Sequence, residues 1–313
     1  MTALALAVDL GGTKVEAALV AADGRIAPGS RHRRPTGAEA DAERLAAAVA
    51  EAVAEALGAL PPGDALLGTG IGSAGPVDLA AGTVSPLNLP AWRDYPLRDL
   101  VAGLAADAAP AAPVVLAIDG LCIALAEHWV GAGRGASSLM GMIVSTGIGG
   151  GLVLDGRPVP GPTGNAGHIG HVEVAGFDDP CACGGRGCLE AVASGPSTVA
   201  WARAQGWTGG TGEELAAAHA AGDPLARAAV SRAGTALGRA IASASALVDL
   251  ELVAVGGGFA RVAPELLGAA RAAVAERRAL GFVTRTRIVP SALEGDGPLV
   301  GAAALVHRAG VLA

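Results

Sequence analysis

One local pattern constrains the fold of this chain more than any other: an apolar strand runs into a glycine turn, and a second strand follows. The pattern first occupies residues 4–20, with its turn at residues 9–14. It returns in residues 139–154, with its turn at residues 145–151. Strand, turn and strand form a β-hairpin. The sequence therefore predicts two related halves, each of which opens with a glycine hairpin.

The first turn carries groups that can hold a phosphate. Its paired glycines leave backbone N–H groups uncovered at the tip of the hairpin, and Thr13 and Lys14 add a hydroxyl and a cation. The turn is not a Walker A loop, because the GxxxxGK[ST] spacing is missing and a strand follows it. An ordinary structural turn is the alternative when this hairpin is considered alone.

Elsewhere, apolar strands alternate with helices. Leu45, Val49, Val53 and Leu57 recur at a spacing of four, which predicts an amphipathic helix. A polar edge strand is expected at residues 25–34, with its RHRR cluster in solvent. The remaining strands are expected at residues 65–71, 113–118, 252–255 and 286–289, and the helices at residues 38–60, 95–106, 121–130, 213–221, 224–248, 264–277 and 299–309. This alternation is typical of an α/β fold.

The length of the chain predicts two domains, because 313 residues exceed the usual size of one hydrophobic core. We place an N-terminal α/β domain at residues 1–118, completed by a C-terminal helix at residues 299–313. A larger C-terminal α/β domain then takes residues 119–298 and carries the cysteine-rich stretch.

Composition excludes several classes of partner. A formal charge of −7 and an aromatic content of 3% argue against a nucleic-acid groove. The N-terminus lacks the basic segment of a signal peptide, and no apolar run reaches the roughly 18 residues of a membrane span. We therefore expect a cytoplasmic protein that binds neither nucleic acid nor a membrane.

Three of the four cysteines have the spacing of metal ligands. One residue separates Cys181 from Cys183, and Cys188 lies five positions after Cys183. His171 lies ten positions before Cys181. This set can close a tetrahedral Cys3His zinc site, which is structural because all four positions are filled by protein. Reduced thiols in a glycine-rich turn are the alternative. The fourth cysteine, Cys122, lies in an apolar helical pattern and is expected in the core.

Polar residues also follow two of the predicted strands. Asp119 ends the strand 113–118, where it could be a helix N-cap or a catalytic carboxylate, and its position alone decides neither. Gly75 lies in a glycine turn after the strand 65–71, and the irregular segment that follows could carry Asn88 to a ligand. In doubly wound sheets, ligands gather at the carboxyl ends of strands.

The whole chain resembles the ROK family of repressors and sugar kinases, in its zinc-containing branch. The resemblance rests on DLGGTK, STGIGGGLVLDG, GNAGHIGH, CACGGRGCLE and VAVGGGFA, which occur in the family's order. It implies an actin-like ATPase, ribonuclease H-like fold with two domains around a central cleft. It also implies an ATP-dependent hexose kinase that uses Mg2+ with ATP.

The resemblance assigns roles to particular residues. Asp119 would be the general base, and His171, Cys181, Cys183 and Cys188 would bind structural Zn2+. The implied contacts to ATP and magnesium are Asp9, Gly11, Gly12, Thr13, Lys14, Thr146, Gly147, Gly149, Gly256, Gly257 and Gly258. The implied contacts to the sugar are Gly75, Asn88, Asp119, Gly147, His168, His171 and Glu190.

Two residues depart from the family pattern, and both would touch the sugar. Ile118 stands where the family usually has Asn, and His168 stands where it usually has Glu. The 6-hydroxyl of glucose is the favoured acceptor. An amino or N-acetylated hexose such as glucosamine, kanosamine, N-acetylmannosamine or N-acetylglucosamine is the alternative. Altered polar contacts can re-specify a buried site.

Other classes in the family are less well supported by the sequence. The family's repressors carry a helix-turn-helix segment ahead of the first hairpin, and here the first strand begins close to Met1. A sugar-binding regulator without turnover is a further alternative, against which Asp119 and Lys14 argue. Polyphosphate is the alternative donor to ATP, and a homodimer or dimer of dimers is the assembly that the resemblance implies.

Overall fold

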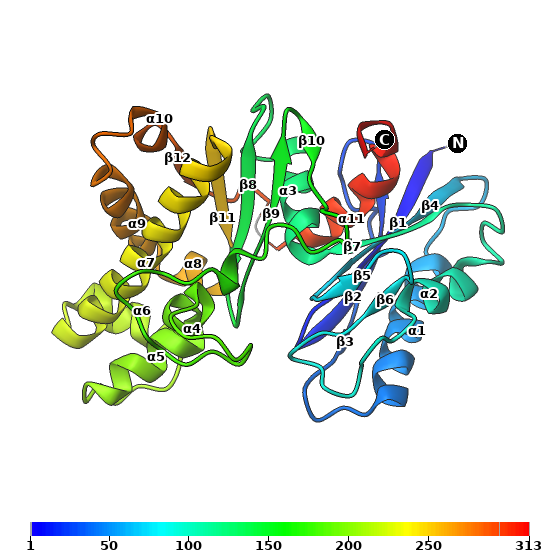
Figure 1. The fold of residues 1–313 in the computed structure, drawn as a ribbon. Coiled ribbons are helices and arrows are strands. Elements are labelled where there is room, and N and C mark those ends of the chain that lie inside the picture. The colour runs from blue at the N-terminus through cyan, green and yellow to red at the C-terminus, as the bar shows by residue number, and fades with distance from the viewer. Residues whose placement is uncertain (1, 294, 313) are drawn as a thin grey trace. The chain divides into compact units, whose positions relative to one another are not determined.

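A computed structural model describes residues 2–293 and 295–312 of the chain (Figure 1). The strands within them are β1 Ala3–Leu10, β2 Lys14–Ala21, β3 His32–Pro35, β4 Ala65–Ser73, β5 Val77–Asp78, β6 Thr83–Val84, β7 Val114–Ile118, β8 Leu139–Val144, β9 Ile148–Leu154, β10 Arg157–Pro158, β11 Leu252–Gly256 and β12 Arg287–Pro290. The helices are α1 Ala42–Gly58, α2 Leu97–Ala105, α3 Asp119–Trp129, the 3-10 helix η1 Ile169–His171, α4 Leu189–Ala193, α5 Gly195–Ala204, α6 Gly212–Ala221, α7 Pro224–Val248, α8 Gly258–Val262, α9 Glu265–Ala275, α10 Gly281–Thr284, α11 Gly297–His307 and α12 Ala309–Leu312.

The first sheet has the strand order β3-β2-β1-β4-β7. β1 pairs with β2 in antiparallel, which confirms the first predicted hairpin, and it pairs with β4 in parallel. β4 in turn pairs with β7 in parallel. β1 is buried from Leu4 to Leu10, and apart from Asp9 these residues are apolar, as in a central strand that is covered on both faces.

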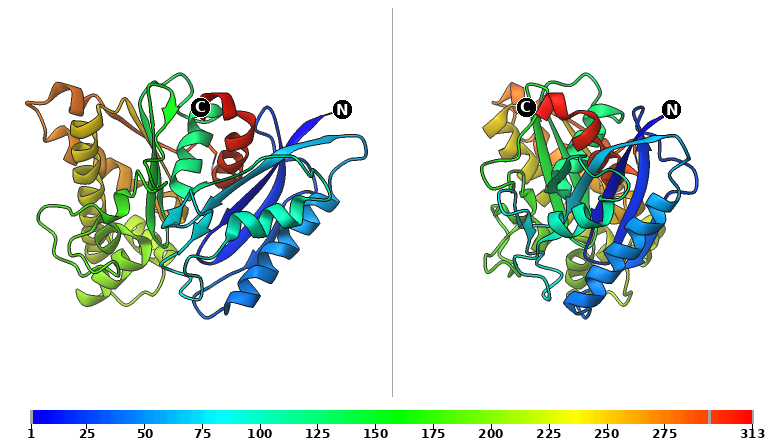
Figure 2. Two further views of the ribbon diagram at one scale, coloured as in Figure 1. Left: turned by 45° about the vertical axis from the view of Figure 1, so that its right-hand side comes forward. Right: turned by 90° about the vertical axis from the view of Figure 1, so that its right-hand side faces the viewer.

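Two pairs of helices cover this sheet. α1 and α2 pack on one face, and α3 and α11 pack on the other (Figures 1 and 2). The Asp41 carboxylate caps α1 by accepting a hydrogen bond from the Arg44 amide at 2.8 Å. Of the apolar residues that predicted α1, Leu45, Val49 and Val53 are fully buried. The amphipathic pattern therefore sets which face of α1 meets the sheet.

Glycines let α11 approach its neighbours unusually closely. A Cβ atom on Gly70 would lie 1.8 Å from the Ala302 carbonyl oxygen, and one on Gly301 would lie 1.7 Å from the Cys122 carbonyl oxygen. Cys122 is fully buried, as expected of a core residue. α11 can therefore lie directly on both β4 and α3 because these glycines carry no side chain.

The second sheet has the strand order β10-β9-β8-β11-β12. β8 pairs with β11 in parallel, and β11 pairs with β12 in parallel. Its order repeats that of the first sheet: a short outer strand, two hairpin strands and two parallel strands. The sheet topology thus matches the two related halves that the glycine hairpins predicted. No helix among the described residues has the length and apolarity needed to cross a membrane.

The chain forms two compact units. The first comprises residues 1–134, 151–167 and 295–313, and the second comprises residues 135–150 and 168–294. The boundary expected from the sequence lies before Asp119, whereas α3 belongs to the first unit, where it packs on α11, β4 and β7. Residues 1, 294 and 313 of the expected domains lie outside the described residues.

The polar strand expected at residues 25–34 is largely absent. β3 begins at His32, and Ile26 forms only an isolated bridge with Val20. Gly24 and Gly29 have φ angles of 83° and 75°, in the left-handed region where a strand cannot continue. β3 is nevertheless the edge strand of its sheet, as predicted.

Candidate functional site

The predicted site residues fall into two groups, one in each compact unit. In the first unit, parallel pairing sets Leu10 beside Ser73, and Ser73 beside Ile118. The strands β1, β4 and β7 therefore end at the same edge of the sheet. The segments that leave this edge carry Asp9, Gly11, Gly12, Thr13, Lys14, Gly75, Asn88 and Asp119.

Asn88 lies against the tip of the first hairpin. A Cβ atom on Gly12 would lie 2.1 Å from the Asn88 Nδ2 atom, so any residue but glycine would displace this side chain. The turn itself is closed by the Gly11 amide, which donates to the Lys14 carbonyl at 2.9 Å. The irregular segment does bring Asn88 to the glycine turn.

Asp119 occupies the first position of α3, and Ile118 is the N-cap. The Asp119 Oδ1 atom accepts a hydrogen bond from the Gly120 amide at 2.7 Å. Asp119 is therefore not the N-cap of α3, which was the alternative to a catalytic role. Its carboxylate is still stabilised by the positive end of the helix dipole. The residue is partly exposed at the carboxyl edge of the sheet, where a ligand can reach it.

Asp9 is the buried carboxylate of this group, with 7% of its surface exposed. Burial first, and then the neighbouring charges of Asp119 and Glu16, raise the pKa of Asp9 to about 7 against the opposing charges of Lys14 and Arg31. The Asp9 carboxyl is therefore shielded from water and lies near two other carboxylates, and both conditions disfavour its charged form. A cation bound beside Asp9 would therefore stabilise the charged carboxylate.

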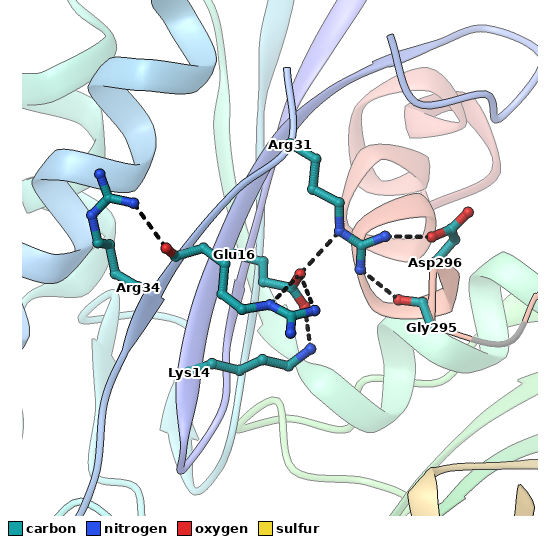
Figure 3. A network of polar contacts seen from close by, with 7 residues as sticks. Lys14, Glu16, Arg31, Arg34, Gly295 and Asp296 are labelled. Atoms are coloured by element: carbon teal, nitrogen blue, oxygen red, sulfur yellow. Dashed lines mark hydrogen bonds and ion pairs between the residues drawn. The ribbon is translucent and has the colours of Figure 1, made fainter. Parts of the chain in front are cut away.

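Glu16 joins this group and was not anticipated from the sequence. It faces the same side of the sheet as Asp9, its partner across the β1–β2 ladder. Its carboxylate is 2% exposed and pairs with Lys14, with Arg31 at 2.9 Å and with Arg33 at 2.9 Å (Figure 3). Burial alone would raise the pKa of Glu16, but hydrogen bonds from Arg31, Lys14 and Arg33 lower it to about 2.

The RHRR cluster is therefore not simply a solvated edge. Arg31 Nη1 also donates to the Asp296 carboxylate at 2.6 Å, and Nη2 donates to the Gly295 carbonyl at 3.0 Å (Figure 3). Arg34 pairs with Glu51 and Glu55 on α1. The sequence feature that could have revealed Glu16 is its position two residues after Lys14 in a strand, since such residues share one face.

In the second unit, Glu190 supports the turn between β8 and β9. Its Oε2 atom accepts a hydrogen bond from the Ile148 amide at 2.7 Å. A Cβ atom on Gly147 would lie 2.6 Å from the same oxygen, so any other residue here would push the Glu190 carboxylate aside. The predicted residues Thr146, Gly147 and Gly149 surround this contact.

The four predicted metal ligands come together. One ligand atom from each of His171, Cys181, Cys183 and Cys188 lies within 4.8 Å of the others. Cys181 Sγ is 3.7 Å from His171 Nδ1, and Cys183 Sγ is 3.6 Å from Cys188 Sγ. A tetrahedral zinc with bonds of about 2.3 Å needs ligand atoms roughly 3.8 Å apart, so the geometry fits this metal.

His168 lies beside the cluster. Its ring centroid is 5.8 Å from that of His171, and its buried Nε2 atom has no hydrogen-bond partner among the described residues. Burial, and then the charge of His171, lower the pKa of His168. A buried polar nitrogen without a partner is costly, so a ligand group that pairs with it would be favoured.

Gly170 connects the histidines to the β8–β9 turn. A Cβ atom there would lie 2.0 Å from the Ile148 carbonyl oxygen, which belongs to the residue whose amide Glu190 holds. The backbone of η1 therefore packs directly on β9. The sequence shows the glycine between His168 and His171, but only the structure shows what it touches.

The glycine run after β11 lies beside the end of β8. Gly256 pairs with Ile143, and a Cβ atom on Gly257 would lie 2.5 Å from the Val144 carbonyl oxygen. Gly257 has a φ of 101°, which excludes other residues. The structure thus brings Gly256, Gly257 and Gly258 to the turn that holds Thr146 and Gly147.

Comparisons with known proteins agree with this arrangement. A model described as the ROK family matches residues 5–309 of the chain. The chain is 34% identical to a glucokinase of Thermotoga maritima, over 97% of each protein. It is 32% identical to an N-acetylmannosamine kinase of Yersinia pseudotuberculosis, over 95% of this chain and 96% of that protein.

Solved structures that are similar to this chain also belong to the ROK family. A ROK hexokinase from Thermus thermophilus has a TM-score of 0.82 and 34% identity, and the match covers 98% of each chain. A ROK family glucokinase from Streptomyces griseus, in complex with glucose and AMPPNP, has a TM-score of 0.81 and 30% identity, over 97% of this chain and 99% of that one. The predicted α/β fold of the actin-like ATPase type is confirmed.

Proposed function

This chain belongs to the ROK family, and we propose that it is an ATP-dependent hexose kinase with Asp119 as its general base. The observation that carries the proposal is the place of Asp119, at the sheet edge that also carries the glycine turn and Lys14. A base and a phosphate cradle at one edge are what phosphoryl transfer to a hydroxyl requires.

The proposed reaction is a single displacement. A sugar hydroxyl oxygen forms a bond to the γ-phosphorus of ATP, the bond to the leaving ADP oxygen breaks, and the hydroxyl proton passes to the Asp119 carboxylate. Magnesium, when bound with ATP, offsets charge on the phosphate oxygens. Backbone amides of the first hairpin and the cation of Lys14 bind the same oxygens.

The remaining predicted contacts are part of this proposal. For the nucleotide they are Asp9, Gly11, Gly12, Thr13, Thr146, Gly147, Gly149, Gly256, Gly257 and Gly258. For the sugar they are Gly75, Asn88, Gly147, His168, His171 and Glu190. Zinc held by His171 and the three cysteines would fix the loop before Glu190, and it would activate no water because its four positions are filled by protein.

Asp119→Asn tests the base. The amide keeps the size of the side chain but cannot accept the proton, so kcat should fall by about 10²- to 10⁴-fold. The dissociation constants of ATP and hexose, measured by calorimetry, should stay nearly unchanged. Asp155→Asn is the matched control, because Asp155 lies in an exposed turn with φ of 51°, which Asn also tolerates. Substantial turnover by Asp119→Asn would remove Asp119 as the base.

His168 supports a second candidate, a kinase for an amino or N-acetylated hexose. Its unpartnered Nε2 atom is a neutral hydrogen-bonding group in a place where the family usually has a carboxylate. Ile118, which is 3% exposed, likewise removes an amide. An N-acetylmannosamine kinase is among the relatives of the chain.

A substrate panel separates the two candidates. ADP release is measured with glucose, mannose, glucosamine, kanosamine, N-acetylglucosamine and N-acetylmannosamine, with ATP or polyphosphate as the donor. The highest kcat/KM for glucose supports the first candidate, and the highest for an amino or acetamido sugar supports the second. His168→Glu should then move the ranking toward glucose. An unchanged ranking would show that His168 does not select the substrate.

A further inference from the structure

One arginine on α7 contacts three separate segments around the cysteine cluster. Arg232 Nη2 donates to the Asp179 carboxylate at 2.6 Å, and Nη1 donates to the Val192 carbonyl at 3.3 Å. The guanidinium carbon lies 5.1 Å from the centre of the Phe177 ring and 5.3 Å from that of the Trp201 ring. The side chain is 17% exposed, so these contacts are weakly screened by water.

The contact with Asp179 holds the loop that carries the cysteines. Asp179 lies two residues before Cys181, and its carbonyl accepts a hydrogen bond from the Gly187 amide at 2.8 Å. Gly187 directly precedes Cys188. The residue that Arg232 binds therefore lies where the loop begins and also where it returns. Fixing Asp179 fixes both ends of the loop.

The contact with Val192 holds the helix that carries Glu190. Val192 lies in the last turn of α4, where carbonyl groups lack partners within the helix and carry partial negative charge. A guanidinium satisfies such a carbonyl well. α4 has only five residues, too few to be stable alone, so its orientation depends on contacts of this kind.

The helix that carries Arg232 is a suitable support. α7 has 25 residues and packs against α4, α5, α6 and α9. Gly234 lies within the same region of α7, and a Cβ atom there would lie 2.6 Å from the Leu266 carbonyl oxygen of α9. Close backbone packing of α7 on α9, two residues after Arg232, limits how far the Arg232 Cα atom can move.

We propose that Arg232 is a positioning residue that joins the cysteine loop to the helix carrying Glu190, so that metal binding and hexose binding share one geometry. The proposal rests on the proposed function for the role of Glu190. It predicts that losing the guanidinium weakens two properties together, the retention of zinc and the affinity for hexose. The affinity for ATP should fall less than the affinity for hexose.

Arg232→Met tests this in the zinc-loaded protein, because methionine keeps the apolar stem and removes the guanidinium. Zinc release to an excess of a chromogenic chelator should become about tenfold faster, and the KM for hexose should rise about tenfold. The KM for ATP should rise less than the KM for hexose, since the nucleotide contacts of the first hairpin are not altered. Arg232→Lys keeps the charge but loses the forked guanidinium, so its zinc release and hexose KM should lie between those of the original chain and those of Arg232→Met.

Arg239→Met is the matched control on the same face of α7. The Arg239 guanidinium lies 5.7 Å from the same Phe177 ring and donates to the Ala175 carbonyl at 2.9 Å. Among the described contacts it reaches neither Asp179 nor Val192. It should therefore leave zinc release and the hexose KM near their original values. Equal effects of Arg239→Met and Arg232→Met would overturn the proposal, as would an equal rise in the KM values for hexose and ATP.

A double-mutant cycle keeps the test decisive if Arg232→Met folds poorly. Asp179→Asn removes only the loop side of the ion pair, and combining it with Arg232→Lys should release zinc no faster than the faster single variant. Additive effects would show that the two residues do not act together. Zinc release is measured without sugar or nucleotide, so it tests Arg232 even if no hexose in the panel is phosphorylated, a result that would refute the proposed function alone.

Discussion

Asp9→Asn should make the folded protein more stable above neutral pH. The same substitution removes a carboxylate that we propose contacts the nucleotide. Asp9 is 7% exposed, and its pKa rises from 3.8 to about 7 in the folded protein. Between these values the folded state keeps a proton that the unfolded chain has lost. The free energy of unfolding therefore falls as pH rises through this window.

The size of the effect follows from the pKa shift. Each pKa unit corresponds to about 1.4 kcal/mol, so the ionised Asp9 costs the fold about 4 kcal/mol once the pH exceeds its folded pKa. Below the unfolded value of 3.8 the cost is absent. Asparagine carries no charge at any pH. The stability difference between Asp9→Asn and the original chain should therefore grow from near zero in acid to about 4 kcal/mol at mildly alkaline pH.

Urea unfolding of the nucleotide-free and magnesium-free protein measures this difference across the pH range. The comparison at each pH cancels the titration of all other groups. Asp107→Asn, at an exposed position, is the control and should show no such trend. A stability difference between Asp9→Asn and the original chain that is the same at acid and alkaline pH would refute the reasoning, because it would mean that Asp9 titrates alike in the folded and unfolded states.

Three further predictions concern Glu16 in the first unit, and Gly170 and the cysteine cluster in the second. Glu16→Gln should lose about 3 kcal/mol of stability at neutral pH, since the Glu16 pKa is lowered from 4.5 to about 2. That loss should shrink as the pH falls below 4.5, where the unfolded chain takes up the proton, and should vanish near pH 2, where folded Glu16 is protonated too, so the urea midpoints of variant and original chain converge there. Gly170→Ala should cost about 1–3 kcal/mol and raise the hexose KM, because its Cβ would meet the Ile148 carbonyl oxygen, whereas Gly58→Ala in open space should do neither. Removing zinc should raise the hexose KM while hydrogen exchange shows that the first hairpin is still folded. An unchanged KM would refute the orienting role of the metal.

The sequence by itself determined most of the elements and the metal ligands. Apolar runs that end in glycine turns set the strands of both sheets, because buried strands and tight turns leave little choice of residue. The spacing of Cys181, Cys183 and Cys188 predicted a zinc site for a similar reason, and the structure brings these three thiols together with His171. The strand expected at residues 25–34 was wrong because glycines with positive φ interrupt it.

Only the tertiary structure decided which distant residues support the site. Glu16, Arg31 and Asp296 meet although they lie far apart along the chain, and Arg232 reaches Asp179 and Val192 from another helix. Sequence patterns report periodicity within one element, whereas these contacts depend on how elements pack and on where a long side chain ends. The raised pKa of Asp9 is likewise a property of its neighbours, because burial and nearby charges exist only once the sheet and helices have assembled.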